Sequence, residues 1–307
     1  MRVCWLCPRD SISIGREETP FRAIPLKRLH SSSHSPGPRL AAVFAVVMAA
    51  LASGTALAFG PEGHSIVAEI AHRRLSPAAT RHVQELLGGN ASLASIASWA
   101  DDVRDQRPET ANWHFVDIPL AERGYSAARD CRSRDRGDCI VQALPRALAA
   151  LRDAHTAKPE RIEALMFVVH FVADLHQPLH AVQDDRGGNT FPVKFFLDPR
   201  RQRAVDTNLH QVWDFGLIRS QVWDWGAYVM RLESDWLQRA DRVVIRAGSI
   251  AEWATESHDI AAIAVFAGVE RGATLGDDYI ARARPWLDRQ LGIAGLRLAA
   301  LLNDALR

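Results

Sequence analysis

The residues from Leu165 to His180 read LMFVVHFVADLHQPLH, and this stretch decides the fold. Apolar side chains fill almost every position ahead of Pro178, which predicts a helix over about 160–177 that is buried nearly all round. His170 and Asp174 interrupt the apolar run four positions apart, so both project from one face of that helix. Buried ionisable groups need partners, and a metal ion is one of the few that satisfies both residues.

Most of the chain after residue 58 also has helical apolar spacing. Gly88-Gly89 provides a stop for one helix, and Pro77 suits its first turn. Arg186–Asn189 predicts a turn, and Thr190–Leu197 is the one segment with a convincing strand pattern. We predict further helices over about 63–74, 77–87, 140–154, 207–219, 224–246, 249–267 and 276–304. The expected fold class is all-α, a single helical domain with a short β excursion near 180–205.

The first 58 residues have the pattern of a secretory leader that is removed. An apolar run from Leu40 to Leu51 follows a basic flank, and the segment ends in Ala56-Leu57-Ala58. The alternative is a membrane anchor, but the apolar run is shorter than the ~20 residues that span a bilayer. We therefore expect residues 59–307 to form a secreted or periplasmic domain, a monomer with no membrane partner after processing.

The expected mature chain carries a slight negative charge. The leader holds seven of the 37 Lys/Arg and three of the 36 Asp/Glu, which leaves 30 basic and 33 acidic residues, a net charge of −3. Such a chain is not a polycation that coats nucleic acid, so affinity for a polyanion must come from a local site. The composition, with 48% hydrophobic and 24% charged residues, is ordinary for a soluble globular protein.

Two cysteines remain after removal of the leader. Cys131 and Cys139 lie in a polar loop rich in Arg, Asp and Gly. A pair at this spacing in a secreted protein predicts a local disulfide. The alternative, two free thiols, does not suit an oxidising compartment.

A second His–Asp pair repeats the arrangement of the first. His210 and Asp214 are again four residues apart, and His180 lies just past the end of the apolar helix. A single pair of this kind is more simply explained as a hydrogen bond. The burial expected for the first pair changes this balance, as do three further candidate ligands, His64, Asp101 and His114. Together these residues favour a multinuclear metal site.

Several segments resemble the S1/P1 nuclease family of single-strand nucleases in order and spacing. They are Phe59-Gly60 with Gly63-His64, Ser98-Trp99-Ala100-Asp101, Trp113-His114-Phe115, the run from His170 to His180, and Asn208-Leu209-His210-Gln211-Val212-Trp213-Asp214. The resemblance extends from Phe59 to Gly295–Asn303 and covers essentially the whole expected mature chain. It implies a helical fold similar to zinc phospholipase C. It also implies hydrolysis of single-stranded DNA and RNA to 5′-nucleotides, with 3′-nucleotidase activity.

The resemblance also implies three zinc ions, each with its own ligands. The first set is Asp101, His114, His170 and Asp174, and the second is His180, His210 and Asp214. The third is His64, Asp174 and the backbone amine and carbonyl of Phe59, so that Asp174 bridges two ions. The family usually begins its mature chain with Trp where this chain has Phe59, but the liganding atoms there are backbone atoms.

Asp101 and Arg104 are the expected catalytic residues. Bound zinc lowers the pKa of a coordinated water, which supplies hydroxide near neutral pH as the nucleophile. Arg104 occupies the position of the family's phosphate-contacting arginine, and its planar charged fork suits the charge that develops on phosphate. The alternative for Arg104 is a solvated arginine at a helix end.

Three residues are expected to bind the substrate. Phe115 could stack on a base, while Asp117 and Asn189 could contact the base edge. Stacking tolerates any base but requires an unpaired strand, which explains a preference for single strands. The alternative for Phe115 is a place in the apolar core.

Two competing functions remain open at this point, a zinc phospholipase C and a protein that binds metal without catalysis. The segments around His114 and Asp214 favour the nuclease, and Arg104 argues against a protein that only binds metal. Among the other histidines, His176 is expected to support the ligands or the core. His258 is expected on a helix surface.

Overall fold

The computed structural model describes residues 59–89, 91–133, 137–197, 203–221, 224–240 and 248–307, which fall within one compact unit, Thr55–Arg307. The predicted leader, residues 1–58, lies outside the described residues. The longer helices are α2 (Pro61–His72), α3 (Pro77–Leu87), α6 (Ile140–Arg152), α7 (Lys158–Leu175), α10 (Trp225–Ser234), α13 (Ile250–Ile260) and α14 (Asp277–Ala305). The shorter helices and helical turns are η1 (Leu93–Ile96), α4 (Trp99–Asp102), η2 (Pro108–Thr110), α5 (Ala127–Asp130), η3 (Pro178–Ala181), η4 (Asp184–Arg186), α8 (Leu209–Gln211), η5 (Val212–Gly216), α9 (Leu217–Arg219), α11 (Trp236–Arg239) and η6 (Ala261–Val265). Strands of the described segments are β1 (Pro192–Phe195), β2 (Val205–Asn208) and β3 (Thr274–Leu275).

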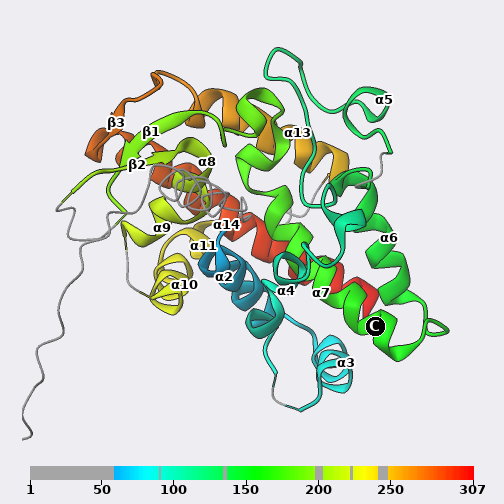
Figure 1. The fold of residues 1–307 in the computed structure, drawn as a ribbon. Coiled ribbons are helices and arrows are strands. Elements are labelled where there is room, and N and C mark those ends of the chain that lie inside the picture. The colour runs from blue at the N-terminus through cyan, green and yellow to red at the C-terminus, as the bar shows by residue number, and fades with distance from the viewer. Residues whose placement is uncertain (1–58, 90, 134–136, 198–202, 222–223, 241–247) are drawn as a thin grey trace, which may run out of the picture. The chain divides into compact units, whose positions relative to one another are not determined.

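Helix α7 lies at the centre of the core (Figure 1). From Ala164 to Leu175 its side chains are buried, with the exception of Met166, which confirms the expected burial nearly all round. Burial of each large apolar side chain contributes roughly 1.5–3 kcal/mol. The helix ends at Leu175, ahead of Pro178, because proline cannot donate to a continuing helix. His170 and Asp174 are therefore fixed deep inside the protein.

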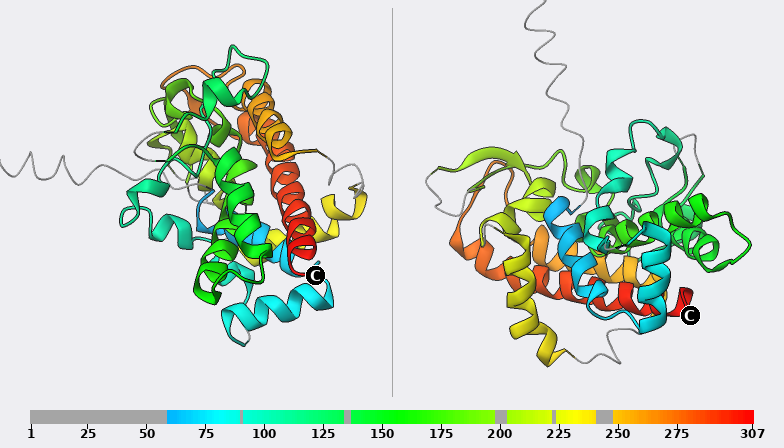
Figure 2. Two further views of the ribbon diagram at one scale, coloured as in Figure 1. Left: turned by 90° about the vertical axis from the view of Figure 1, so that its right-hand side faces the viewer. Right: turned by 90° about the horizontal axis from the view of Figure 1, so that it is seen from below.

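Helices α2 and α14 make one of the most extensive contacts between elements of the described chain. Figure 2 shows α14 running along most of the length of this unit. The two helices approach closely at Gly295, where an added Cβ would lie 2.4 Å from Ile70 Cγ2. Because α2 carries His64, this close approach also positions a candidate ligand.

The structure confirms the all-α class and most of the expected helices, with boundaries shifted by a few residues. The single helix expected over 224–246 is wrong, because Asp235 (φ −126°, ψ −81°) interrupts it and α11 ends at Arg239. Residues 241–246 of that prediction lie outside the described residues. Among the described helices, none is both long enough and apolar enough to cross a membrane.

The strand expected near 180–205 is joined by two strands that the sequence did not predict. Strand β1 pairs antiparallel with β2 and parallel with β3, in the order β2-β1-β3. The helix expected over 207–219 begins only at Leu209, because Thr207 and Asn208 pair with β1. Asn208 Oδ1 accepts a hydrogen bond from Gln211 N (2.9 Å) and so caps α8, the helix that carries His210.

Candidate metal centre

Eight buried or nearly buried side chains from separate elements converge inside the protein. They are His64 from α2, Asp101 from α4, His114 from the loop after η2, His170 and Asp174 from α7, His180 from η3, His210 from α8 and Asp214 from η5. All eight side chains that the sequence marks as candidate ligands are therefore brought together. Packing of α2, α4 and η3 against α7 places them there.

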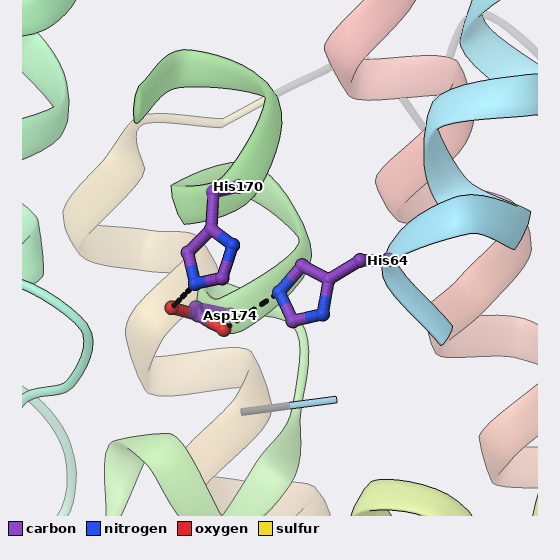
Figure 3. Close-up of side chains that lie close together, drawn as sticks. All are labelled: His64, His170 and Asp174. Atoms are coloured by element: carbon purple, nitrogen blue, oxygen red, sulfur yellow. Dashed lines mark hydrogen bonds and ion pairs between the residues drawn. The ribbon is translucent and has the colours of Figure 1, made fainter. Parts of the chain in front are cut away.

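The Asp174 carboxylate lies between several histidines. Its Oδ1 is 3.1 Å from His64 Nε2, and its Oδ2 is 3.1 Å from both His114 Nδ1 and His170 Nε2. Figure 3 shows His64 and His170 facing this carboxylate from different elements. His180 Nδ1 also lies 3.7 Å from Asp174 Oδ1. A carboxylate with different neighbours at each oxygen is suited to bridge two cations.

The eight side chains form three groups, each with its possible ligand atoms within 4.8 Å of one another. The groups are His64, His170 and Asp174; Asp101, His114 and His170; and His180, His210 and Asp214. The third group coincides with an expected ligand set. The first differs in that His170 joins His64, and their rings stack with centroids 4.1 Å apart.

Three histidines of the centre are held in one tautomer by backbone carbonyls. His170 Nδ1 donates to Ala97 O (2.7 Å), His180 Nδ1 to His114 O (2.8 Å) and His210 Nδ1 to Gly187 O (2.6 Å). Each bond leaves the Nε2 lone pair available. This arrangement fixes the ring orientation of metal-binding histidines in proteins generally. His176 differs, because Val172 O and Arg297 engage both of its nitrogens.

Several buried polar atoms of the centre make no hydrogen bond, among the residues that the structure describes. They are Asp101 Oδ1, His114 Nε2, His180 Nε2 and Asp214 Oδ2. A buried polar atom without a partner is costly, so such a cluster calls for a cation. The donor set, imidazole nitrogen and carboxylate oxygen, fits zinc. The residues present therefore fit the metal that the sequence implies.

Electrostatics within the centre also favour bound cations. Burial raises the pKa of Asp214 well above its ordinary value, although Gln177 donates a hydrogen bond to it. Burial lowers the pKa of His114 to about 4, and burial together with the charge of His180 lowers that of His210 to about 3. Neutral imidazole is the form that binds metal, and a cation would restore the carboxylate form of Asp214.

Phe59 lies at the edge of the same centre. Its side chain is fully buried, and the next residue, Gly60, donates its backbone N–H to Asp214 O (2.9 Å). His64 Nδ1 lies 3.4 Å from Gly60 O. The start of α2 is thus tied to two groups of candidate ligands. An added Cβ at Gly63 would lie 2.9 Å from Phe59 Cβ, so the ring packs directly on the first turn of the helix.

A cavity of about 300 Å³ opens beside the centre and gathers the other predicted site residues. His114, His180 and His210 contribute to its wall, and so do Arg104, Phe115, Asp117 and Asn189. Arg104 is half-buried and donates to Ala111 O (2.8 Å). Phe115 is half-buried and lines the cavity, so it is not enclosed in the core.

Comparison with known proteins matches residues 59–307 to the S1/P1 nuclease family. Endonuclease 4 of Arabidopsis thaliana is 32% identical over 283 residues, which cover 84% of this chain and 92% of the relative. Nuclease P1 of Penicillium citrinum is 28% identical over 273 residues, which cover 80% of this chain and 97% of the relative. Nuclease S1 of Aspergillus oryzae is 27% identical over 292 residues, which cover 87% of this chain and 97% of the relative.

The chain belongs to the S1/P1 nuclease family. It is an endonuclease, a hydrolase that acts on the phosphodiester bonds of nucleic acid. The resemblance seen in the sequence motifs is thus confirmed. These matches support the nuclease over the phospholipase C alternative.

Sequence reasoning missed two residues that shape this nuclease site. Gln177 is fully buried, accepts from Leu179 N (2.6 Å) and donates to Asp214 Oδ1 (2.6 Å). Arg186 lines the cavity without having been singled out. The surface position expected for His258 is wrong, since it is only 2% exposed and its Nε2 lies 3.1 Å from Pro119 O. The position of Gln177 inside the His170–His180 motif was the available signal.

The predicted disulfide of the nuclease is present. Cys131 and Cys139 are bonded, with Cα atoms 5.2 Å apart. Cys139 directly precedes α6, and Ile140 N donates to Phe115 O (3.1 Å). The closed loop is therefore tied to one wall of the cavity.

Proposed function

We propose that this nuclease is a secreted, zinc-dependent enzyme that cleaves single-stranded DNA and RNA to 5′-nucleotides and has 3′-nucleotidase activity. Residues 1–58 would be its removed leader and residues 59–307 its catalytic domain. The family match begins at Phe59, the residue expected to start the mature chain, and this supports the division. The observation that carries the proposal is Asp174, whose two carboxylate oxygens face different candidate ligand groups.

Three zinc ions would be held by the converging side chains. Asp101, His114, His170 and Asp174 would hold the first ion, and His180, His210 and Asp214 the second. The third would be held by His64, Asp174 and the backbone of Phe59. Support comes from the three side-chain groups and from the buried atoms that lack partners within the described residues.

When bound, zinc supplies a water acidified to near-neutral pH and positive charge for the phosphate. Asp101 is nearly buried, with its Oδ1 3.5 Å from His114 Nδ1 and 3.6 Å from His170 Nε2, and would supply a carboxylate oxygen to the first ion. Arg104 would contact a phosphate oxygen from the cavity wall and stabilise the charge that develops there. The backbone carbonyls on His170, His180 and His210 would keep the three rings oriented throughout the reaction.

The cavity would select single strands. Phe115 would stack on an unpaired base, while Asp117 would accept from its edge. Asn189 donates one of its two Nδ2 hydrogens to Arg186 O (2.9 Å), which leaves its Oδ1 and the second Nδ2 hydrogen for the base. A base within a duplex cannot present its face to Phe115 without leaving its stack.

The test compares wild type with Asp174→Asn, with both proteins beginning at Phe59. Metal content is measured by mass spectrometry, and cleavage is measured on single-stranded DNA, duplex DNA, a 3′-mononucleotide and phosphatidylcholine. We expect three zinc ions, single-strand cleavage and release of phosphate from the 3′-mononucleotide in wild type. Asp174→Asn should lose zinc and lose more than about 100-fold in activity, since even supporting residues of metal sites cost 10–100-fold.

Asp206→Asn is the matched control, because the Asp206 side chain is 91% exposed on β2. It should behave as wild type. A wild-type protein that binds fewer than two zinc ions would refute the ligand assignment. Zinc binding with hydrolysis of phosphatidylcholine alone would refute the nucleic-acid substrate.

A further inference from the structure

The rim of the cavity contains an unusual left-handed turn. Asp185, Arg186, Gly187 and Gly188 follow one another with φ of 50°, 55°, 62° and 78°. Within the described residues, Asp185 and Arg186 are the non-glycine residues with positive φ. L-residues adopt this conformation at a cost in free energy, and it persists only where the surroundings enforce it.

Contacts from three sides hold this turn in place. Arg271 pairs with Asp185 Oδ1 (2.7 Å) and donates to Thr190 O (2.7 Å). His210 Nδ1 donates to Gly187 O (2.6 Å), which joins the turn to the metal centre. At Gly187 any side chain is excluded, because a Cβ would lie 2.5 Å from Leu179 O. The turn is therefore a rigid support with a fixed relation to the candidate ligands.

Arg186 is the residue that this rigid support presents to the cavity. It lines the same wall as Arg104, but Arg186 is exposed whereas Arg104 is half-buried. No acidic side chain of the described segments pairs with Arg186. The cavity thus has one arginine toward its floor and another, available for a ligand, at its rim.

We propose that Arg186 binds a second phosphate of the substrate, the one adjoining the scissile phosphate along a single strand. The inference rests on the proposed function, which places the scissile phosphate at Arg104 and the metal centre. A guanidinium is permanently charged and matches phosphate geometry. The expected mature chain has a net charge of −3, so attraction for a polyanion depends on local cations such as this one.

The second phosphate distinguishes two classes of substrate. A 3′-mononucleotide and a dinucleotide with one phosphodiester lack it, whereas a trinucleotide and longer strands have it. Arg186 therefore raises the affinity for polynucleotides without changing that for substrates with a single phosphate. The fixed backbone holds the Cα of Arg186 at the rim before the substrate arrives, so only the side chain has to be ordered on binding.

The experiment measures KM and kcat for a thymidine dinucleotide, a trinucleotide and a 3′-mononucleotide, with wild type and Arg186→Gln. The KM for the trinucleotide should rise roughly five- to tenfold, with the other two KM values unchanged. The slope of log(1/KM) against log salt for a longer single strand should become shallower by about 0.7, the value for one phosphate contact. Arg186→Lys keeps the positive charge, so its trinucleotide KM and its salt slope should lie between those of wild type and those of Arg186→Gln.

Two further variants separate binding from folding. Arg186→Gly suits the left-handed backbone, so it should not lower Tm, yet it should raise the trinucleotide KM as Arg186→Gln does. Arg81→Gln removes an exposed arginine from α3, outside the cavity, and should leave all three KM values unchanged. A wild-type protein that cleaves neither dinucleotide nor trinucleotide would refute the proposed function. Cleavage of both with a trinucleotide KM and a salt slope that are unaffected by Arg186→Gln would refute only the second phosphate site.

Discussion

Gln177 lies fully buried between two parts of the centre and uses both ends of its amide. Its oxygen accepts from Leu179 N, so the orientation of the amide is fixed and its nitrogen must donate to Asp214 Oδ1. The other oxygen of Asp214 is left facing His210 Nε2 at 3.2 Å. Gln177 therefore acts as a positioning residue that presents one oxygen of Asp214 to a cation.

Gln177→Leu should weaken zinc binding by the group of His180, His210 and Asp214 about 10- to 100-fold, the usual range for loss of a supporting hydrogen bond. The measurement is a zinc titration against a competing chelator, which reads metal affinity directly. Gln84→Leu on the exposed face of α3 is the control and should leave the affinity unchanged. Unaltered affinity in Gln177→Leu would mean that Asp214 is held by other contacts.

Single residues show where prediction from the sequence succeeds and where it stops. His170 and Asp174 are adjacent on one helix, so their shared face follows from spacing alone. The contact between Gln177 and Asp214 joins residues 37 positions apart, and only the folded chain brings them together. The same holds for His170, whose ring stacks on His64 from another helix.

Helix packing depends on Gly295, where α14 approaches α2 most closely. Gly295→Ala should lower the free energy of unfolding by about 1–3 kcal/mol, because the new Cβ overlaps Ile70 and the helices must separate. Thermal unfolding measures this loss, and a parallel zinc assay follows displacement of His64 on α2. Gly276→Ala at the start of α14 is the matched control, since an added Cβ meets no atom within 4 Å there. Equal Tm values for the two variants would contradict the packing argument.

The disulfide loop stabilises one wall of the cavity. Replacing Cys131 and Cys139 by Ser should lower stability by about 2–3 kcal/mol, because a short loop is no longer closed in the unfolded chain. The expected fall in Tm is roughly 5–10 °C for a domain of this size. Reductant should lower the Tm of wild type by a similar amount and leave the double variant unaffected. A wild-type Tm that resists full reduction would show that the bond contributes little.

The elements that the sequence failed to predict are the short ones. Strand β2 reads Val-Asp-Thr-Asn and has no apolar alternation, while β3 has two residues, which are too few for an alternating pattern. Both strands pair with β1, and they form only because the folded chain brings them beside it. Helix α7 was predictable because burial nearly all round leaves an uninterrupted apolar sequence.

At the scale of the whole molecule, the sequence motifs identify the family of the protein, whereas its composition does not. A net charge of −3 for the expected mature chain gives no sign of a nucleic-acid enzyme, and among the described residues only Arg104 and Arg186 supply arginines to the wall of the cavity. The ordered His and Asp segments extend over the chain and identify both fold and family. The sequence does predict a turn over Arg186–Asn189, but not the left-handed backbone of Arg186, which contacts from Arg271 and His210 enforce.

If residues 1–58 are removed as proposed, the position of Phe59 would couple activity to maturation of the whole chain. Phe59 is fully buried, and Gly60 N donates to Asp214 O (2.9 Å), so residue 59 lies beside the centre. If its free amine binds zinc, an extension converts that amine into an amide, which is a poor ligand.

Protein that begins at Phe59 should hold three zinc ions, whereas protein with a retained Met or leader should hold about two and lose most of its activity. Native mass spectrometry and single-strand cleavage measure both quantities, and protease removal of an engineered extension should restore them. Full zinc content and full activity in the extended protein would exclude the Phe59 amine as a ligand, while leaving the side-chain ligands unaffected.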